Sequence, residues 1–135
     1  MGQSPTLTTL GHLVLTVASI EVTSAFYQDI LGMQAESFTV ADGTKHWALK
    51  FGTQKFNLHQ TGAEFDPKSA NPTAGSGDMC FLTATPMIDW MKHLSTHGIT
   101  IEEGPVARTG ATRPIMSIYI RDPDRNLIEI SVAND

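Results

Sequence analysis

One arrangement of segments occurs twice in this sequence, and the repetition limits the possible folds more than any other feature. In the first copy, a β-rich run at residues 12–17 precedes a segment whose apolar residues recur at helical spacing, and further β-rich runs follow up to residue 60. Ser19 and Gly32 stand where a helix is expected to begin and to end. The first copy therefore predicts the order strand, helix, strand, strand, strand.

The same order returns in the second half of the chain. Residues 61–77 are rich in Gly, Pro, Ser and Asn, which is typical of a linker. A β-rich run follows, Thr85-Pro86 opens a helical segment, and Gly98 ends that segment before three more β-rich runs. The two copies are aligned at Leu15 with Leu82, at Gly32 with Gly98, and at His59 with Glu129.

A unit of this kind leaves one apolar face uncovered, so both copies are needed to form a core. The sequence therefore predicts an α+β fold in which two βαβββ repeats form curved mixed sheets around a central metal-binding cavity. We expect a single domain over residues 1–135, with repeat one at about 10–60, the linker at 61–77 and repeat two at about 78–132.

Charge and composition exclude several classes of partner. The formal net charge is −5 and no basic stripe is present, so neither nucleic acid nor an anionic membrane is expected to bind. No apolar stretch approaches the roughly 20 residues that span a bilayer. The N-terminal residues lack the pattern of a secretory signal, and Cys80 is the single cysteine, so a cytoplasmic location is expected.

Glu129 is the residue that most directly suggests chemistry, because it stands between Ile128 and Ile130 in a strand-like run. Side chains alternate across a strand, and a buried carboxylate costs several kcal/mol unless a cation compensates it. If the strand faces with His12, His59 and Glu129 line one cavity, they form a two-His-one-carboxylate metal site. The alternatives are a solvent-exposed face for Glu129 and ordinary strand positions for the histidines.

The stretches GHLVLTV, FYQDILGM, NLHQ and DPDRNLIEI, in this order across a duplicated unit, resemble the vicinal oxygen chelate superfamily. That superfamily includes glyoxalase I, extradiol dioxygenases, fosfomycin-resistance enzymes and bleomycin-binding proteins. The resemblance covers residues from about 10 to 132. Within the superfamily the chain is most similar to the group called glyoxalase-domain or virulence proteins.

The resemblance implies a divalent metal held by His12, His59 and Glu129, with Fe²⁺ as the first expectation and Ni²⁺, Zn²⁺ or Mn²⁺ as alternatives. The family's fourth ligand position falls on Met79 or on Asp78, depending on the alignment. Tyr119, ten residues before Glu129, matches the tyrosine that helps to hold a substrate oxygen in extradiol dioxygenases. Tyr119 and Glu129 are therefore the expected catalytic residues.

Departures from the family pattern narrow the expected reaction. Thr16 and Ala63 stand where glyoxalase I proteins of bacterial type carry an arginine and an asparagine, so a strict dependence on glutathione is not expected. Residues 107–114 are interpreted as a lid over the site. The residues that we expect to contact substrate are Trp47, Asn57, Met79, Arg113 and Arg121.

Three functions remain open from the sequence. The first is a metal-dependent enzyme that chelates adjacent oxygens of a small molecule and catalyses a dioxygenase-type reaction. The second is a glyoxalase-type lyase or isomerase. The third is a metal-free protein that binds a drug or a metabolite. In each case a homodimer is expected, whose site is completed within one chain or across two.

Overall fold

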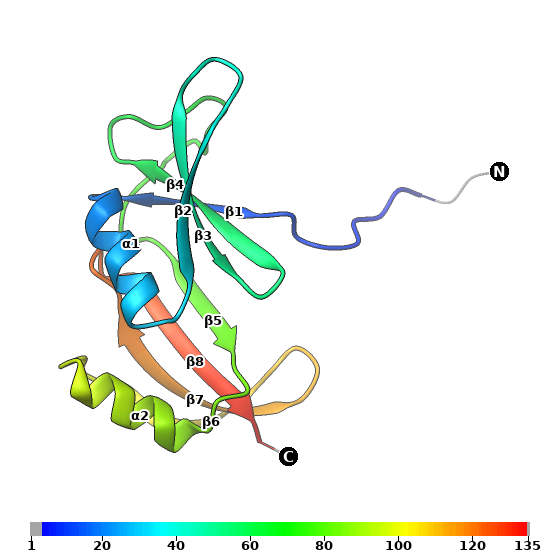
Figure 1. Ribbon diagram of the computed structural model, residues 1–135. Helices are drawn as coiled ribbons and strands as arrows, with labels where there is room; N and C mark the ends of the chain where they lie inside the picture. Colours follow the sequence, from blue (N-terminus) through cyan, green and yellow to red (C-terminus); the bar gives the residue numbers. More distant parts are fainter. Residues whose placement is uncertain (1–3, 135) are drawn as a thin grey trace.

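The structure, a computed structural model, describes residues 4–134, and it contains the predicted order of elements twice (Figure 1). The first module comprises β1 (Leu13–Val17), α1 (Ile20–Asp29), β2 (Gln34–Thr39), β3 (Lys45–Phe51) and β4 (Gln54–Gln60). The second comprises β5 (Asp78–Leu82), α2 (Met87–Thr96), β6 (Glu103–Thr109), β7 (Pro114–Arg121) and β8 (Leu127–Ala133). The predicted α+β fold of two βαβββ modules is confirmed.

Each module forms a mixed four-stranded sheet, with the strand orders β1-β4-β3-β2 and β5-β8-β7-β6. The first strand of each module pairs in parallel with the last, and the remaining pairs are antiparallel. Consequently β1 and β5 both lie at the edge of their sheets. No helix among residues 4–134 is long and apolar enough to cross a membrane.

The helix signals were read correctly, but one apolar position was not. The Ser19 hydroxyl accepts a hydrogen bond from the Val22 N–H at 3.2 Å, as expected of an N-cap. Gly32 and Gly98 end the two helices with φ values of 71° and 69°. Val22 was expected on the buried face of α1, yet it is 54% exposed, whereas Tyr27 is fully buried.

Tyr27 belongs to a polar cluster that joins the two modules. Its hydroxyl donates to Asp122 Oδ2 at 2.7 Å, and Asp122 also accepts from the Asp124 N–H, the Asn126 N–H and the Asn126 side chain at 2.8 to 2.9 Å. Asn126 Oδ1 accepts from the Gly77 N–H at 2.7 Å. Burial, and then the Asp122 carboxylate, raise the pKa of Tyr27 far above its usual value, so the phenol stays a donor.

The hydrophobic core lies between the modules, on one face of each sheet. Leu15, Leu58 and Leu49 from the first module share a cluster with Ile118 and Ile130 from the second. Because side chains alternate along a strand, the residues between these positions face away from the core. Each module therefore has a second sheet face that the rest of the chain does not cover in the same way.

The strand register corrects the internal alignment. Gly32 and Gly98 are 66 positions apart, and the same offset takes His12 to Asp78 and Val14 to Cys80. Since Val14 pairs with Asn57 and Cys80 pairs with Glu129, Asn57 is the counterpart of Glu129. The predicted equivalence of His59 and Glu129 is therefore wrong by two residues.

Candidate functional site

The open face of the first module carries His59 and Asn57. Their strand neighbours Phe56 and Leu58 are buried in the core, so His59 and Asn57 face the other way. Thr16 is the cross-strand partner of His59. A cavity of about 250 Å³ on this face is lined by Val14, Thr16, His59, Pro67, Lys68, Ser69 and Pro72, so the linker lies over His59.

The surroundings of His59 favour its neutral form. Burial lowers the pKa of His59, nearby His46 lowers it further, and Glu64 partly offsets the change. The Phe65 ring of the linker stacks on His46 with the centroids 3.9 Å apart, and it meets His59 edge-on at 5.4 Å. Neutral imidazole is the form that binds a metal ion.

Asn57 has an acceptor without a partner. Its Oδ1 atom is buried, and no donor among residues 4–134 forms a hydrogen bond with it. A buried polar atom without a partner costs free energy, so such atoms call for a specific explanation. An oxygen of this kind suits a cation or a donor group of a ligand on this face.

The open face of the second module carries Glu129. Ile128 and Ile130 are buried in the core, and Glu129 is half-buried on the opposite side of β8. Its Oε2 atom accepts a hydrogen bond from Ser117 Oγ at 2.6 Å. A cavity of about 260 Å³ on this face is lined by Asp78, Glu102, Glu103, Tyr119, Leu127 and Glu129.

Tyr119 lies directly across from Glu129 in the β7–β8 pair. The Tyr119 hydroxyl accepts a hydrogen bond from Arg108 Nε at 2.9 Å, and Arg108 also forms an ion pair with Glu103. Because the hydroxyl accepts from Arg108, its own proton is available to an oxygen in the cavity. The phenol and the carboxylate are thus both presented on the face of the second module.

A single copy of the chain does not bring the predicted triad together. His12 is exposed and precedes β1, while His59 and Glu129 line different cavities. Within residues 4–134, no three His, Cys, Asp or Glu side chains are grouped closely enough to hold a metal ion. The donor types themselves, imidazole and carboxylate, suit a divalent cation.

Comparison with known proteins places this fold in a family. Residues 9–130 match the family described as the Glyoxalase/Bleomycin resistance protein/Dioxygenase superfamily. The chain belongs to this superfamily. The membership that the sequence motifs predicted is therefore confirmed.

Several members of the superfamily are close in sequence. Virulence protein STM3117 of Salmonella typhimurium is 55% identical over 122 residues, which cover 90% of this chain and 82% of that protein. Glyoxalase domain-containing protein RDO1 of Mycosarcoma maydis is 51% identical over 126 residues, covering 93% of this chain and 69% of that protein.

Solved structures agree with this assignment. The crystal structure of STM3117 superposes with a TM-score of 0.88 at 51% identity, covering 96% of this chain and all of that one. A protein from the mobile metagenome of V. Pseudocholerae superposes with a TM-score of 0.92 at 49% identity, covering 98% of this chain and 100% of that one.

The residues expected to contact substrate are dispersed in this superfamily member. Trp47 and Met79 pack against the hydrophobic core, on the side away from Glu129. Arg121 forms an ion pair with Glu102 at 3.0 Å. Arg113 is exposed in the loop at 110–113 and borders a cavity of about 570 Å³. Between the two open alignments, Asp78 rather than Met79 lies on the face of Glu129.

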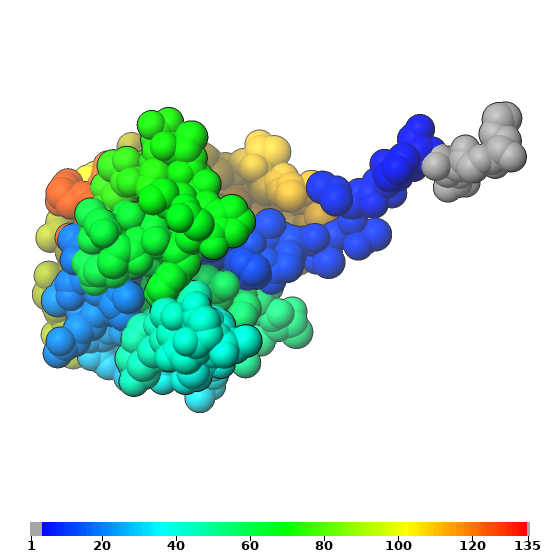
Figure 2. All heavy atoms as spheres, turned by 90° about the horizontal axis from the view of Figure 1, so that it is seen from above, coloured from blue at the N-terminus to red at the C-terminus, as the bar shows by residue number. Residues whose placement is uncertain are grey.

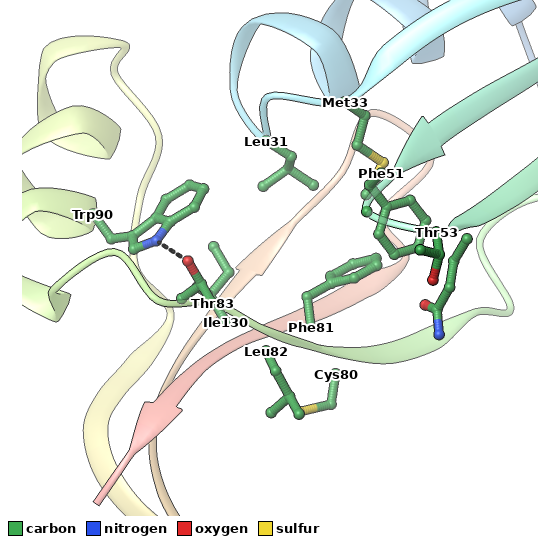
Figure 3. Close-up of a pocket in the computed structure, with 12 residues that line it drawn as sticks. Leu31, Met33, Phe51, Thr53, Cys80, Phe81, Leu82, Thr83, Trp90 and Ile130 are labelled. Carbon is green, nitrogen blue, oxygen red and sulfur yellow. Dashed lines mark hydrogen bonds between the residues drawn. The ribbon is translucent and has the colours of Figure 1, made fainter.

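Sequence reasoning missed a second cavity of about 570 Å³, which lies between the modules (Figure 3). Its lining is mostly apolar and includes no charged side chain: Leu31, Met33, Phe51, Gly52, Thr53, Gln54, Cys80, Phe81, Leu82, Thr83, Trp90 and Ile130. The Trp90 ring N–H donates to Thr83 Oγ1 at 3.1 Å. No sequence signal reveals such a cavity, because it depends on how the two modules pack.

Proposed function

We propose that the chain is a metal-dependent enzyme that binds adjacent oxygens of a small substrate at a site shared by two copies. One observation carries this proposal: His59 and Glu129 are on the sheet faces that point away from the common core, each in its own cavity. Two copies related by a two-fold axis can place the first-module face of one against the second-module face of the other, twice.

The edge strands support this arrangement. Leu13 and Val14 of β1 are 40% and 41% exposed, and Leu82 of β5 is 72% exposed. Unpaired edges with exposed apolar side chains are surfaces that a second copy can cover. Residues 4–12 extend away from the body of the molecule and carry Leu7 and Leu10, which are 100% and 67% exposed (Figure 2).

In the shared site, His12 and His59 of one copy would hold the ion together with Glu129 of the second copy. Asp78 adds a carboxylate beside Glu129, and Asn57 adds its free oxygen beside His59. When bound, the ion supplies a Lewis acid for adjacent substrate oxygens, and iron also supplies oxygen activation. FosX of Listeria monocytogenes, 18% identical with a TM-score of 0.64 over 96% of this chain and 93% of that one, was solved with Mn(II).

A dioxygenase-type reaction is the first candidate, because Tyr119 lies beside Glu129. The Arg108 guanidinium fixes the phenol oxygen, so the phenol proton can be donated to a substrate oxygen in the cavity. A lyase or isomerase reaction is the second candidate. Asp78 lies on the same face, and a carboxylate so placed can take part in proton transfer.

A metal-free binding protein is the third candidate, and the cavity between the modules favours it. Its volume of about 570 Å³ suits a small organic molecule, and its uncharged lining suits a neutral one. In this case the ligand would contact Trp90 and Phe81 rather than Glu129 (Figure 3).

Metal analysis combined with oxygen uptake tests the proposal. After reconstitution with Fe²⁺, the protein is expected to retain about one ion per chain, and to consume oxygen with an oxygen-chelating substrate such as a catechol. Turnover of a substrate without oxygen would contradict the dioxygenase reaction and support the lyase or isomerase. Failure to retain any divalent ion would overturn both and leave the binding protein.

A further inference from the structure

Two buried serines share the sheet face of Glu129. Ser117 on β7 and Ser131 on β8 are cross-strand partners, and both are fully buried. Their hydroxyl oxygens are 2.7 Å apart, and Ser117 Oγ is 2.6 Å from Glu129 Oε2. Cys80 on the neighbouring strand β5 places its Sγ atom 3.4 Å from Ser131 Oγ. A continuous polar chain therefore runs from Cys80 to the carboxylate.

The chemistry of these groups fixes the direction of the chain. An ionised carboxylate only accepts hydrogen bonds, so Ser117 must donate its proton to Glu129. The Ser117 oxygen is then free to accept from Ser131, whose oxygen can accept from the Cys80 thiol. Ser131 Oγ lies 3.4 Å from Glu129 Oε2, a distance at which the hydrogen bond is weak. Ser117 is thus the main partner of the carboxylate.

We propose that Ser117 is a positioning residue that orients Glu129 so that Oε2 is engaged and Oε1 faces the cavity. This inference rests on the proposed function, in which Glu129 holds a divalent ion. It adds that Glu129 binds the ion through one oxygen only. Hydrogen-bond partners of this kind fix the orientation of a ligand side chain and raise metal affinity.

An ordinary packing role for Ser117 makes a different prediction. Small facing residues on adjacent strands can fill space without acting on Glu129, and alanine would then serve as well as serine. The chain offers a matched control, since Ser24 Oγ is also buried but has no hydrogen-bond partner among the described residues. Replacing Ser24 removes a buried hydroxyl that contacts no metal-binding residue.

The test measures Mn²⁺ affinity by titration calorimetry on the full chain. Ser117→Ala is expected to weaken binding by roughly 10- to 100-fold, while Ser117→Thr, which keeps the hydroxyl, restores most of the affinity. Ser24→Ala is expected to bind as the unaltered protein does. Equal affinities for Ser117→Ala and the unaltered protein would overturn the inference.

A metal-free measurement separates failure of this inference from failure of the proposed function. In the protein without metal, the Ser117 hydroxyl proton is expected to exchange slowly and to give an NMR signal that shifts in Glu129→Gln. If the unaltered protein binds no Mn²⁺ but this signal is present, the positioning stands and the metal site fails. If the signal is absent or does not respond to Glu129→Gln, the positioning of Glu129 by Ser117 is wrong.

Discussion

Glu129→Ala is expected to lower the affinity for a divalent ion by at least about 100-fold, because the loss of a ligand exceeds the loss of a group that merely orients one. Glu129 is the carboxylate whose free oxygen faces the cavity, whereas its other oxygen is held by Ser117. Alanine removes both the charge and the donor atom. Titration calorimetry with Mn²⁺, supported by elemental analysis, measures the change.

Two further variants make this result specific. Glu129→Gln keeps the size of the side chain but removes its charge, and it is expected to bind nearly as poorly as alanine. Glu102 lines the same cavity but is paired with Arg121, so Glu102→Ala is expected to retain the ion. A Glu129→Ala protein that binds Mn²⁺ as tightly as the unaltered chain would contradict the assignment of Glu129 as a ligand.

Asp122→Ala is expected to lower the free energy of unfolding by about 3–5 kcal/mol, the range measured when one partner is removed from a buried, paired charge. Asp122 is 4% exposed and accepts hydrogen bonds from Tyr27, Asp124 and Asn126. Its removal leaves these donors buried without an acceptor, at the contact between α1 and the β7–β8 turn. Urea unfolding followed by circular dichroism measures the loss.

Tyr27→Phe is the matched variant for this cluster. It removes one donor and keeps the buried ring, so a loss of about 1–2 kcal/mol is expected. Asp124, which is only partly buried and accepts from the Ala18 N–H at 3.2 Å, should matter less than Asp122. Losses below 1 kcal/mol for Asp122→Ala would show that the cluster does not stabilise the contact between the modules.

The fold was accessible from the sequence because local signals and the repeat agreed with each other. Ser19 and Gly32 marked the ends of a helix, and Gly98 repeated the second signal in the other module. The face of Glu129 was also predictable, since strand alternation places it opposite Ile128 and Ile130. These inferences needed only short-range patterns.

The details of register were not accessible in the same way. A shift of one residue moves a side chain to the other face of a sheet, which is why Asp78 and Met79 could not be separated from sequence. The lid expected at residues 107–114 instead forms the ends of β6 and β7, with Thr109 paired to Pro114. β6 begins at Glu103, later than the strand expected near Ile99, because its pairing partner on β7 decides where it starts.

The meeting of His59 with Glu129 depends on a partner that strand patterns do not describe. Alternation predicts that each residue leaves the core, and it leaves open which surface each residue meets. The unpaired acceptor of Asn57 and the exposed edges of β1 and β5 are visible only in the folded chain. They are the features that support a site completed by a second copy.

The central claim is tested most directly by mixing two inactive variants, His59→Ala and Glu129→Ala, and measuring bound Mn²⁺ after co-refolding. Each variant alone is expected to bind no ion. In a two-fold dimer, every mixed pair contains one site with both unaltered residues, so the mixture should regain about a quarter of the sites of the unaltered protein. If the mixture binds no more Mn²⁺ than the separate variants while the unaltered protein binds it, the site is not shared between copies.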